Sequence, residues 1–272
     1  MKILLTAAVI AATTSLALAG SDDVNPDVIF GSGNANGSFT IANGGGIELG
    51  LRAKVRYNAA NAPENTFNYD GVDTYTMQAG SPNGAPAAGW AIGDNARWNF
   101  EWSVNTDVAG TTGNNLDDFN YQIAMFRVNA DGNTIGDALA FDMINGYNPA
   151  TSAVQWDHSI GNNTTGNGDG IEIWNNQSNA ALYADRIANN NVAQNSWNYG
   201  FFDGIAGTAL EDWDFNAVGS YIIRLTAFDK ITGLEIVSES ITVNVVPLPT
   251  AAWAGLGMLG AFAGIRTIRR RA

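Results

Sequence analysis

The sequence predicts an all-β fold, an antiparallel β-sandwich of the jelly-roll or immunoglobulin-like kind, with a hydrophobic segment at each end of the chain. Short runs that alternate apolar and polar residues recur along the chain between turn residues, which is typical of such sandwiches. The 272 residues include 31 Gly and 32 Asn, and both types favour turns. The sequence contains no Cys, so the fold must depend on its hydrophobic core or on bound ions.

Residues 1–19 have the three parts of a secretory signal peptide. Lys2 supplies the positive charge, residues 3–12 form the apolar stretch, and Ala17-Leu18-Ala19 has the small-x-small pattern of a cleavage site. We expect cleavage directly after this triplet. The body, residues 20–246, is then long enough for one large β domain, and we find no internal repeat and no clear linker in it.

The first part of the body contains the signals of several short strands. Asp70-Gly71 supplies a tight turn, so we expect the runs on either side of it to form a hairpin. Two prolines mark the segment after the hairpin as a loop. We expect strands at 27–30, 38–42 and 46–58, hairpin strands at 65–69 and 73–78, and the loop at 80–89.

Residues 97–104 alternate cleanly, with Trp98, Phe100 and Trp102 on one face and polar residues on the other. We expect these rings to lie in the core, since aromatic residues more often fill a sandwich core than bind a ligand. The further elements expected here are a hairpin of residues 120–128 and 138–143 around Asp131-Gly132, short strands at 153–160, 171–174 and 196–202, and a short helix at 179–189.

Residues 219–246 carry the strongest strand signal in the chain. Two long alternating runs flank the turn Lys230-Ile231-Thr232-Gly233, which predicts a long hairpin. Leu234 and Ile236 are out of phase with the apolar residues of 241–245, so we expect a bulge near residues 238–240.

The C-terminal segment, residues 247–272, follows the last strand almost without a linker. It consists of the motif Val246-Pro247-Leu248-Pro249, an uncharged run at 251–265, and an arginine cluster. As a helix, the run is roughly 22 Å long, which is short of the ~30 Å hydrocarbon core of a bilayer. The positive-inside rule places the cluster in the cytoplasm and the body outside. The cluster consists of Arg266, Arg269, Arg270 and Arg271.

This three-part tail resembles the PEP-CTERM sorting signal of exported bacterial proteins, in the order, length and position of its parts. The resemblance implies delivery to the cell surface or extracellular matrix through an exosortase, a membrane protease-transpeptidase. The chain departs from the commonest form at Leu248, where Glu is usual. A plain C-terminal membrane anchor is the alternative. The body, especially 28–36, 46–55 and 190–202, is similar to a group of uncharacterised exported proteins with this type of tail.

The charge of the body argues against some partners. All 26 acidic residues but only 8 of the 13 basic residues lie in the body, which gives it a net charge of −18. Such a surface repels nucleic acid and anionic lipid headgroups, so we expect no nucleic-acid partner. It suits solubility outside the cell.

The residues that could carry catalysis are few. His158, beside Asp157, is the only histidine and thus the only candidate base of a Ser-His-Asp triad, and a structural role is the stronger interpretation. Carboxylate pairs that could serve a glycosidase are present, but with 26 acidic residues their proximity in sequence means little. We therefore assign no catalytic and no cofactor-binding residue. The pairs are Asp117/Asp118, Asp169/Glu172 and Glu211/Asp212/Asp214.

Calcium and sugars are the two ligands that the sequence leaves open. Residues 162–169 form a polar loop with many oxygen ligands, but ordinary turns explain both this loop and 129–137, which lacks the spacing of an EF-hand. We assign no metal ligand, and structural calcium stays a possibility. Tryptophans in a row can stack on sugar rings, and four tryptophans outside 97–104 lie near turns: Trp156, Trp174, Trp197 and Trp213.

Taken together, these features predict an exported, non-enzymatic surface or matrix protein. The alternative is a carbohydrate-binding module of the same sandwich class, and a glycoside hydrolase is third. The expected partners are an exosortase-like protease, the membrane that holds the tail, and an extracellular polysaccharide.

Overall fold

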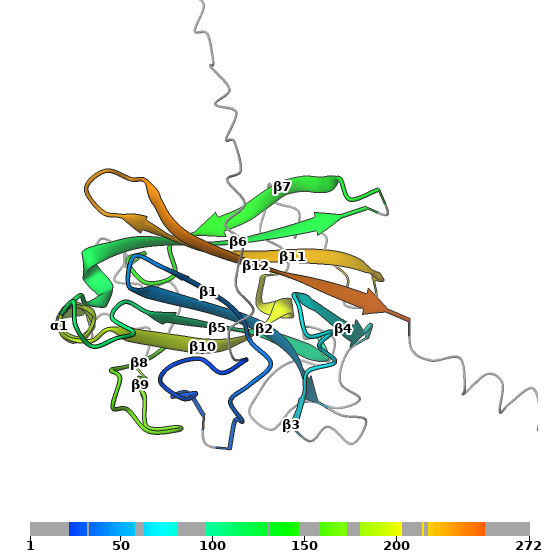
Figure 1. Cartoon of the computed structure of the whole chain (residues 1–272). Helices are drawn as coiled ribbons and strands as arrows, with labels where there is room; N and C mark the ends of the chain where they lie inside the picture. Colours follow the sequence, from blue (N-terminus) through cyan, green and yellow to red (C-terminus); the bar gives the residue numbers. More distant parts are fainter. Residues whose placement is uncertain are drawn as a thin grey trace, which may run out of the picture.

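The computed structural model describes residues 22–31, 33–57, 63–80, 96–129, 131–146, 158–172, 180–202, 214 and 217–247. The described chain is mostly β, which confirms the predicted all-β class. Its strands form two sheets, sheet A and sheet B, which lie one above the other in Figure 1.

Sheet A has the strand order β1-β2-β5-β10-β8-β9, and β3 pairs with β2 outside this path. All its pairs are antiparallel. Its two central long strands coincide with the predicted strands 46–58 and 97–104. The strands are β1 (Thr40–Gly44), β2 (Ile47–Tyr57), β3 (Pro63–Thr66), β5 (Trp98–Asn105), β8 (Ser159–Gly161), β9 (Ile171–Glu172) and β10 (Val192–Asn198).

Sheet B has the strand order β4-β12-β11-β6-β7. Its centre is the predicted long hairpin, which is confirmed, and the hairpin of 120–128 with its partner strand is also present. One pair departs from the expected antiparallel arrangement, because β4 runs parallel to β12. The strands are β4 (Thr74–Gln78), β6 (Phe119–Val128), β7 (Thr134–Phe141), β11 (Gly219–Asp229) and β12 (Glu235–Val246).

The predicted helix at 179–189 is confirmed as α1 (Ala180–Asn189), which buries Tyr183 and Ile187. Two 3₁₀ turns accompany it in the described chain, Leu116–Asp118 (η1) and Tyr199–Phe202 (η3). The second of these corrects the expected strand at 196–202, which begins earlier, at Val192, and ends at Asn198.

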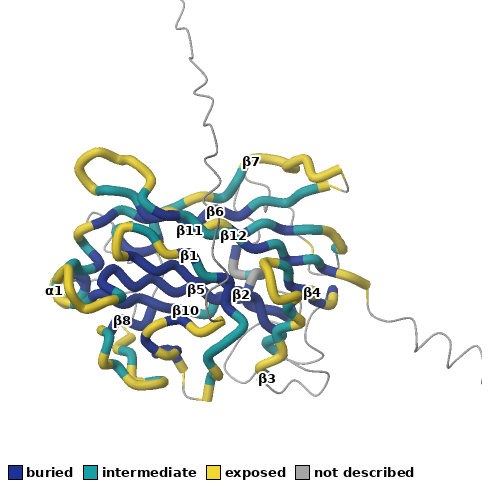
Figure 2. The backbone as a smooth tube through the Cα atoms, viewed as in Figure 1, coloured by how far each residue is buried: buried dark blue, intermediate teal, exposed yellow. Residues whose placement is uncertain are grey.

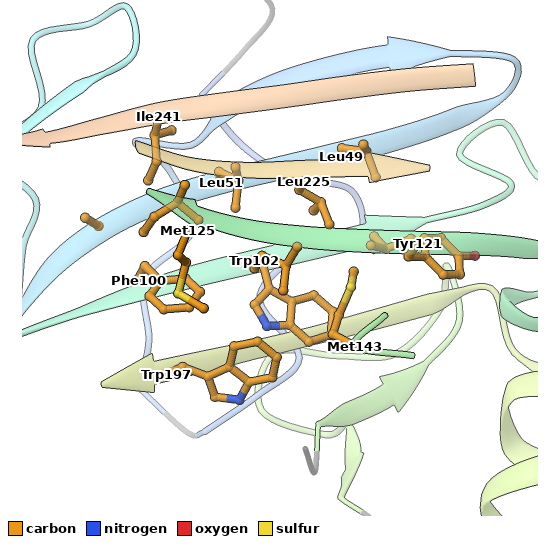
Figure 3. Packing of buried hydrophobic residues seen from close by; sticks show 14 of the residues in the cluster. Leu49, Leu51, Phe100, Trp102, Tyr121, Met125, Met143, Trp197, Leu225 and Ile241 are labelled. Carbon is orange, nitrogen blue, oxygen red and sulfur yellow. The ribbon is translucent and has the colours of Figure 1, made fainter. Parts of the chain in front are cut away.

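The hydrophobic core lies between the two sheets. Alternate residues of β2 and β5 face alternate residues of β6, β11 and β12, because successive side chains of a strand point to opposite faces. Figure 3 shows Trp102 and Phe100 of β5 packed with Trp197 of β10 below Met125 and Leu225. The rings of Trp102 and Trp197 meet edge to face with their centroids 5.3 Å apart. Figure 2 shows the buried backbone concentrated in these central strands.

In the first part of the body, one strand prediction is wrong, and one hairpin prediction holds only next to its turn. Of residues 27–30, Val28, Ile29 and Phe30 are buried and Asp27 is exposed, but none belongs to a strand, and they lie outside the sheets. The runs around Asp70-Gly71 do not pair as a hairpin beyond a single bridge between Tyr69 and Tyr75, because β3 joins sheet A and β4 joins sheet B. The turn itself forms, and the Asp70 carboxylate accepts backbone N–H groups of the residues that follow it.

The bulge in the long hairpin lies closer to its tip than predicted. The register shifts between Ala227 and Phe228, which face Val237 and Glu235, so that Ile236 has no partner. From Val237 onward the buried residues keep one phase. The out-of-phase apolar residues that motivated the prediction are therefore the bulge and the residue before the strand.

Several predicted segments lie outside the described residues. These are the signal peptide, the strand residues 153–157 and 173–174, the loop 81–89 and the tail from Leu248 onward. Within the described part, no helix is long and apolar enough to cross a membrane.

Candidate functional site: the covered face of sheet A

The face of sheet A that points away from the core is polar. It is formed by the residues of β2 and β5 that alternate with the core residues of those strands. These are Gly50, Arg52 and Lys54 of β2 and Glu101 and Ser103 of β5. The β10 residues in register with this phase are Gln194, Ser196 and Asn198. Nearly all these polar side chains are buried. Burial of so many polar groups on the outer face of a sheet indicates that something covers it.

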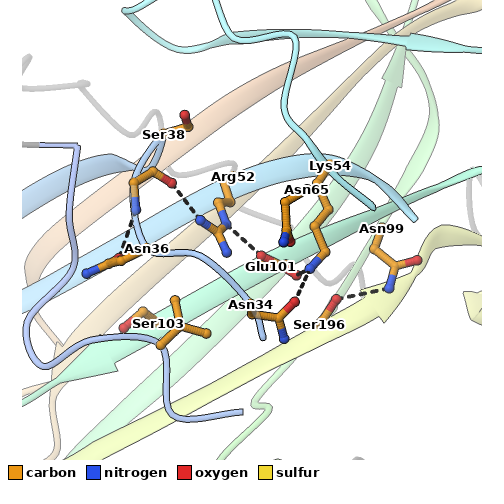
Figure 4. A network of polar contacts seen from close by, with 12 residues as sticks. Asn34, Asn36, Ser38, Arg52, Lys54, Asn65, Asn99, Glu101, Ser103 and Ser196 are labelled. Carbon is orange, nitrogen blue, oxygen red and sulfur yellow. Dashed lines mark hydrogen bonds and ion pairs between the residues drawn. The ribbon is translucent and has the colours of Figure 1, made fainter. Parts of the chain in front are cut away.

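The centre of this face is a buried charge cluster of Arg52, Lys54 and Glu101, in which two cations share one carboxylate (Figure 4). Arg52 Nε lies 2.5 Å from Glu101 Oε2, and Lys54 Nζ lies 2.6 Å from Glu101 Oε1. The Arg52 and Glu101 side chains are fully buried. The cluster carries a net positive charge, and Arg52 Nη2 is buried without a hydrogen-bond partner among the described residues.

Two aromatic rings hold the Arg52 guanidinium in place. Its central carbon lies 4.1 Å from the centroid of the Phe39 ring and 4.5 Å from that of Phe67. Cation–π contacts gain strength when the cation is desolvated, as it is here. The rings thus partly offset the cost of burying a charge that has one unpaired nitrogen.

Burial and charge act on the two titratable partners in opposite ways. Burial raises the pKa of Glu101, but the neighbouring Arg52 and Lys54 charges outweigh it and leave that pKa below its usual range. Burial lowers the pKa of Lys54, and Glu101 restores only part of it because Arg52 and Arg56 repel the ammonium group. The carboxylate is therefore the best-stabilised member of the charge cluster.

The cover of this face is the segment before β1, residues 22–39, which we call the strap; Ser32 is not among its described residues. In Figure 1 the strap is the dark blue stretch on the side of sheet A that faces away from sheet B. Its apolar residues form a small hydrophobic cluster apart from the main core. The members of this cluster are Val24, Val28, Phe30 and Phe39, with Ile41 packed against them.

Side chains of the sheet bind the backbone of the strap. Arg52 Nη1 donates to the Gly37 carbonyl at 2.6 Å, and the backbone N–H of Ile29 donates to Gln194 Oε1 at 2.8 Å. Lys54 Nζ also donates to the side-chain oxygen of Asn34 at 2.6 Å. The charge cluster therefore pairs its carboxylate with both cations and also holds the strap.

The end of this face near the start of β2 is a network of carboxamides. The Asn191 side chain donates to Asn105 Oδ1 and to Asn163 Oδ1, both at 2.8 Å. Next to it, Glu48 accepts the Asn25 backbone N–H at 2.8 Å, and burial raises the pKa of Glu48 to about 6. The sequence suggested that the Asn residues form turns. Here their side-chain amides connect the strands to each other and to neighbouring segments.

His158 is buried directly before β8. Its Nε2 lies 3.0 Å from the Tyr183 hydroxyl, which also donates to the Ile144 carbonyl, and its ring meets the edge of Trp102. These contacts support the structural interpretation of His158. Its sequence neighbour Asp157 lies outside the described part.

Two of the predicted carboxylate pairs belong to separate elements of the described chain. Asp117 and Asp118 belong to η1, where Asp118 accepts the Asn115 N–H, and Asp169 and Glu172 are exposed near β9. In the third group, Glu211/Asp212/Asp214, the first two residues lie outside the described part of the chain. Within the described ranges, no three His, Cys, Asp or Glu residues gather as metal ligands would.

The two loops considered for calcium use their oxygens internally. Asn162 Oδ1 accepts the backbone N–H and hydroxyl of Thr164, and Asn167 donates to the Asn34 carbonyl of the strap. In the other loop, Asn129 Oδ1 accepts two backbone N–H groups of the β6–β7 turn. These bonds are those of ordinary turns.

Trp98 and Trp102 lie in the core, which confirms their prediction, and Trp197 joins them. Trp156, Trp174 and Trp213 lie outside the described residues.

Of the sorting motif, Val246 is the last residue of β12 and Pro247 follows it in an exposed position. Leu248, Pro249 and the arginine cluster lie beyond the described part.

The covered face was not anticipated from the sequence. A usable signal was present, because Arg52 and Lys54 occupy the non-core phase of one long strand and Glu101 occupies that of another. What was missing was the pairing of the two strands. The register places Arg52 directly opposite Glu101, 49 positions away in sequence.

Comparison with known proteins gives no further guide: no protein family, no curated protein and no solved structure matches this chain.

Proposed function

We propose that the chain is an exported, non-enzymatic protein of the cell surface or extracellular matrix, whose body is a single β-sandwich domain held outside the cell by its C-terminal sorting signal. The proposal includes the sandwich class, of jelly-roll or immunoglobulin-like topology, and delivery through an exosortase-like membrane protease. The motif Val246-Pro247-Leu248-Pro249 and the arginine cluster are its sorting elements.

One observation supports the proposal that the protein is not an enzyme: the chain's own strap already covers the polar face of sheet A. A glycoside hydrolase or a carbohydrate-binding module of this class needs a face or cleft that a ligand can reach. Here the most polar sheet face has its side chains bonded to strap atoms, as Arg52 is to Gly37 and Gln194 to Ile29. The described tryptophans, which could have stacked on sugar rings, are core residues.

The position of the last strand, β12, supports the proposed location at the cell surface. β12 is an inner strand of sheet B, between β4 and β11, and it pairs with β4 up to its last residue, Val246. The backbone N–H of Ala79 donates to the Val246 carbonyl at 2.9 Å, so the strand is fixed to its end. Pro247 cannot extend the ladder because it lacks an N–H group. The body therefore ends where the sorting segment begins.

The test is fractionation of cells that express full-length chains with one tag in the body and one after the last residue. Insertion scales put an arginine at a helix centre at roughly 2.5–3.5 kcal/mol, so four arginines resist passage into the membrane. Replacing all four by Gln should release more unprocessed full-length protein. Retention and processing like those of the parent would contradict the stop-transfer role. The variant is Arg266→Gln/Arg269→Gln/Arg270→Gln/Arg271→Gln.

The matched variant changes the motif and leaves the cluster intact. Pro247→Ala/Pro249→Ala should still be held in the membrane but should lose processing near the motif, so both tags should stay on one membrane-bound chain. Normal cutting of this variant would contradict the sorting motif and would favour the plain anchor. Recovery of the parent inside the cell would contradict export itself.

A further inference from the structure

The polar face of sheet A binds the strap as a binding site binds a peptide ligand. We propose that this face is an interaction surface for the strap of a second copy of the same chain, so that copies exchange straps and associate. The occupant is a segment with the sequence of residues 22–39, bound as the chain's own strap is bound in the structure.

The strap holds its own shape. The backbone N–H of Phe39 donates to the Asp22 carbonyl at 2.9 Å, which closes the segment into a loop. Inside it, the Asn36 side chain donates to the Val24 carbonyl and accepts the Val24 N–H, at 3.0 and 3.2 Å. Its apolar residues pack in their own small cluster rather than in the core between the sheets. A segment with internal bonds and a separate apolar cluster can move as a unit.

The face recognises the strap through backbone atoms at several separate points. Besides the bonds from Arg52 and Gln194, the N–H groups of Gly168 and Gly170 donate to strap carbonyls at 3.1 and 2.8 Å. The Asn65 side chain donates to the Gly33 carbonyl at 3.1 Å. Backbone recognition at spaced points is how protein surfaces bind extended peptides.

Charge makes the strap the fitting occupant. The strap carries Asp22, Asp23 and Asp27 and no basic residue, whereas the face is net positive, with Arg52, Lys54 and Arg56 of β2 against Glu48 of β2 and Glu101 of β5. A body with a net charge of −18 has only 8 basic residues, and three of them lie on this one strand. An acidic peptide is therefore attracted to this face and repelled by most of the remaining surface.

A lifted strap must be replaced. Without it, the charge cluster loses its cover and the Gly37 and Asn34 oxygens that accept from Arg52 and Lys54, and the apolar side chains of the strap are exposed to water. Exposing apolar surface is unfavourable, so the open state favours any occupant that restores the cover. The strap of a second copy supplies the same partners, and the exchange costs no interaction in either copy, as in other domain swaps.

The connection between strap and sheet has the backbone of a hinge. Gly37 and Ser38 both have positive φ, 101° and 58°, just before Phe39 and the first residue of β1. Two successive residues in the left-handed region form a sharp bend, and a change of their φ and ψ redirects residues 22–36 without moving the sheet once the backbone bond between Phe39 and Asp22 opens.

The experiment uses the absence of Cys from the chain. A Cβ on Gly50 would lie 2.5 Å from the Val24 Cγ1 atom, so cysteines at these two positions are within disulfide reach. Full-length Val24→Cys chains and full-length Gly50→Cys chains, with different tags, are co-expressed, purified in detergent and oxidised. Exchange predicts a disulfide-linked heterodimer, because each chain alone lacks one cysteine. The double variant Val24→Cys/Gly50→Cys should also close the bond within one chain.

The matched control moves the strap cysteine to the exposed Asp27. Heterodimer from the Val24→Cys pair should exceed that from Asp27→Cys with Gly50→Cys several-fold. Equal yields would overturn the proposal, since they would reflect chance encounters of thiols. Because the new side chain at Gly50 crowds Val24, cysteine-free parent chains with two tags provide a second measurement. Co-capture of the two parents supports exchange, and a strictly monomeric parent in native mass measurements overturns it.

Discussion

Neutralising Glu101 should destabilise the protein far more than neutralising an exposed glutamate. In Glu101→Gln, two ion pairs of 2.5 and 2.6 Å are lost and two cations stay buried without a counter-charge. Removing one partner of a buried ion pair typically costs 3–5 kcal/mol, so we expect a loss of about that size. For a body of this length, each kcal/mol corresponds to roughly 2–4 °C, so the melting temperature should fall by about 6–20 °C.

The assay is guanidinium denaturation followed by the fluorescence of the buried tryptophans, with Glu172→Gln as the matched control. Glu172 lies exposed on β9, so its change should stay within about 0.5 kcal/mol. Because the pKa of Glu101 is lowered in the fold, its stabilisation is present above its unfolded pKa and is lost as the pH falls through the folded value. The difference between parent and Glu101→Gln should therefore shrink in acid. A loss no larger than that of Glu172→Gln would refute the reasoning.

Three further predictions concern other parts of the chain. The pKa of Glu48 is raised to about 6, so its contribution is full below its unfolded value near 4.5 and is lost as the pH rises through 6. Between pH 4.5 and 7.5 the parent should lose about 2 kcal/mol relative to Glu48→Gln in urea midpoints, and parallel curves would contradict this. Trp102→Ala should cost about 3–5 kcal/mol in the same measurement because it opens a cavity in the core, whereas a cost below 1 kcal/mol would not fit a fully buried ring. N-terminal sequencing of exported protein should begin at Gly20, and a start far from it would contradict cleavage after Ala19.

Local patterns in the sequence predicted those strands whose phase is set by apolar side chains. Trp98, Phe100 and Trp102 alternate because one face of β5 is core, and the same argument found β2 and the long hairpin. The failures are of another kind. In the stretch 27–30, Val28, Ile29 and Phe30 are apolar because they cover a sheet, and nothing in the local sequence distinguishes such a cover from a strand. The runs flanking Asp70-Gly71 are short, and their partners lie far away in sequence, so the turn alone could not decide which sheets they join.

The covered face depends on information that no single segment contains. Arg52 and Glu101 look like ordinary solvated residues on the outer phase of two strands, because charged residues are mostly exposed. Only the register that sets them opposite each other, together with the strap above them, makes them buried. The covered face could have been predicted from one pattern: opposite charges on two long strands, at positions that alternate with the core residues.

The central position of β12 determines how the body would carry a mechanical load. In the anchored form proposed above, a pull on Pro247 acts along the axis of β12, which is bonded on one side to β4 and on the other to β11. Force along a strand shears both ladders at once, so many hydrogen bonds must break together instead of one after another. The tether thus enters the fold at a strand that resists extension from both sides. The strap lies at the other end of the described chain, so the pull does not pass along its backbone.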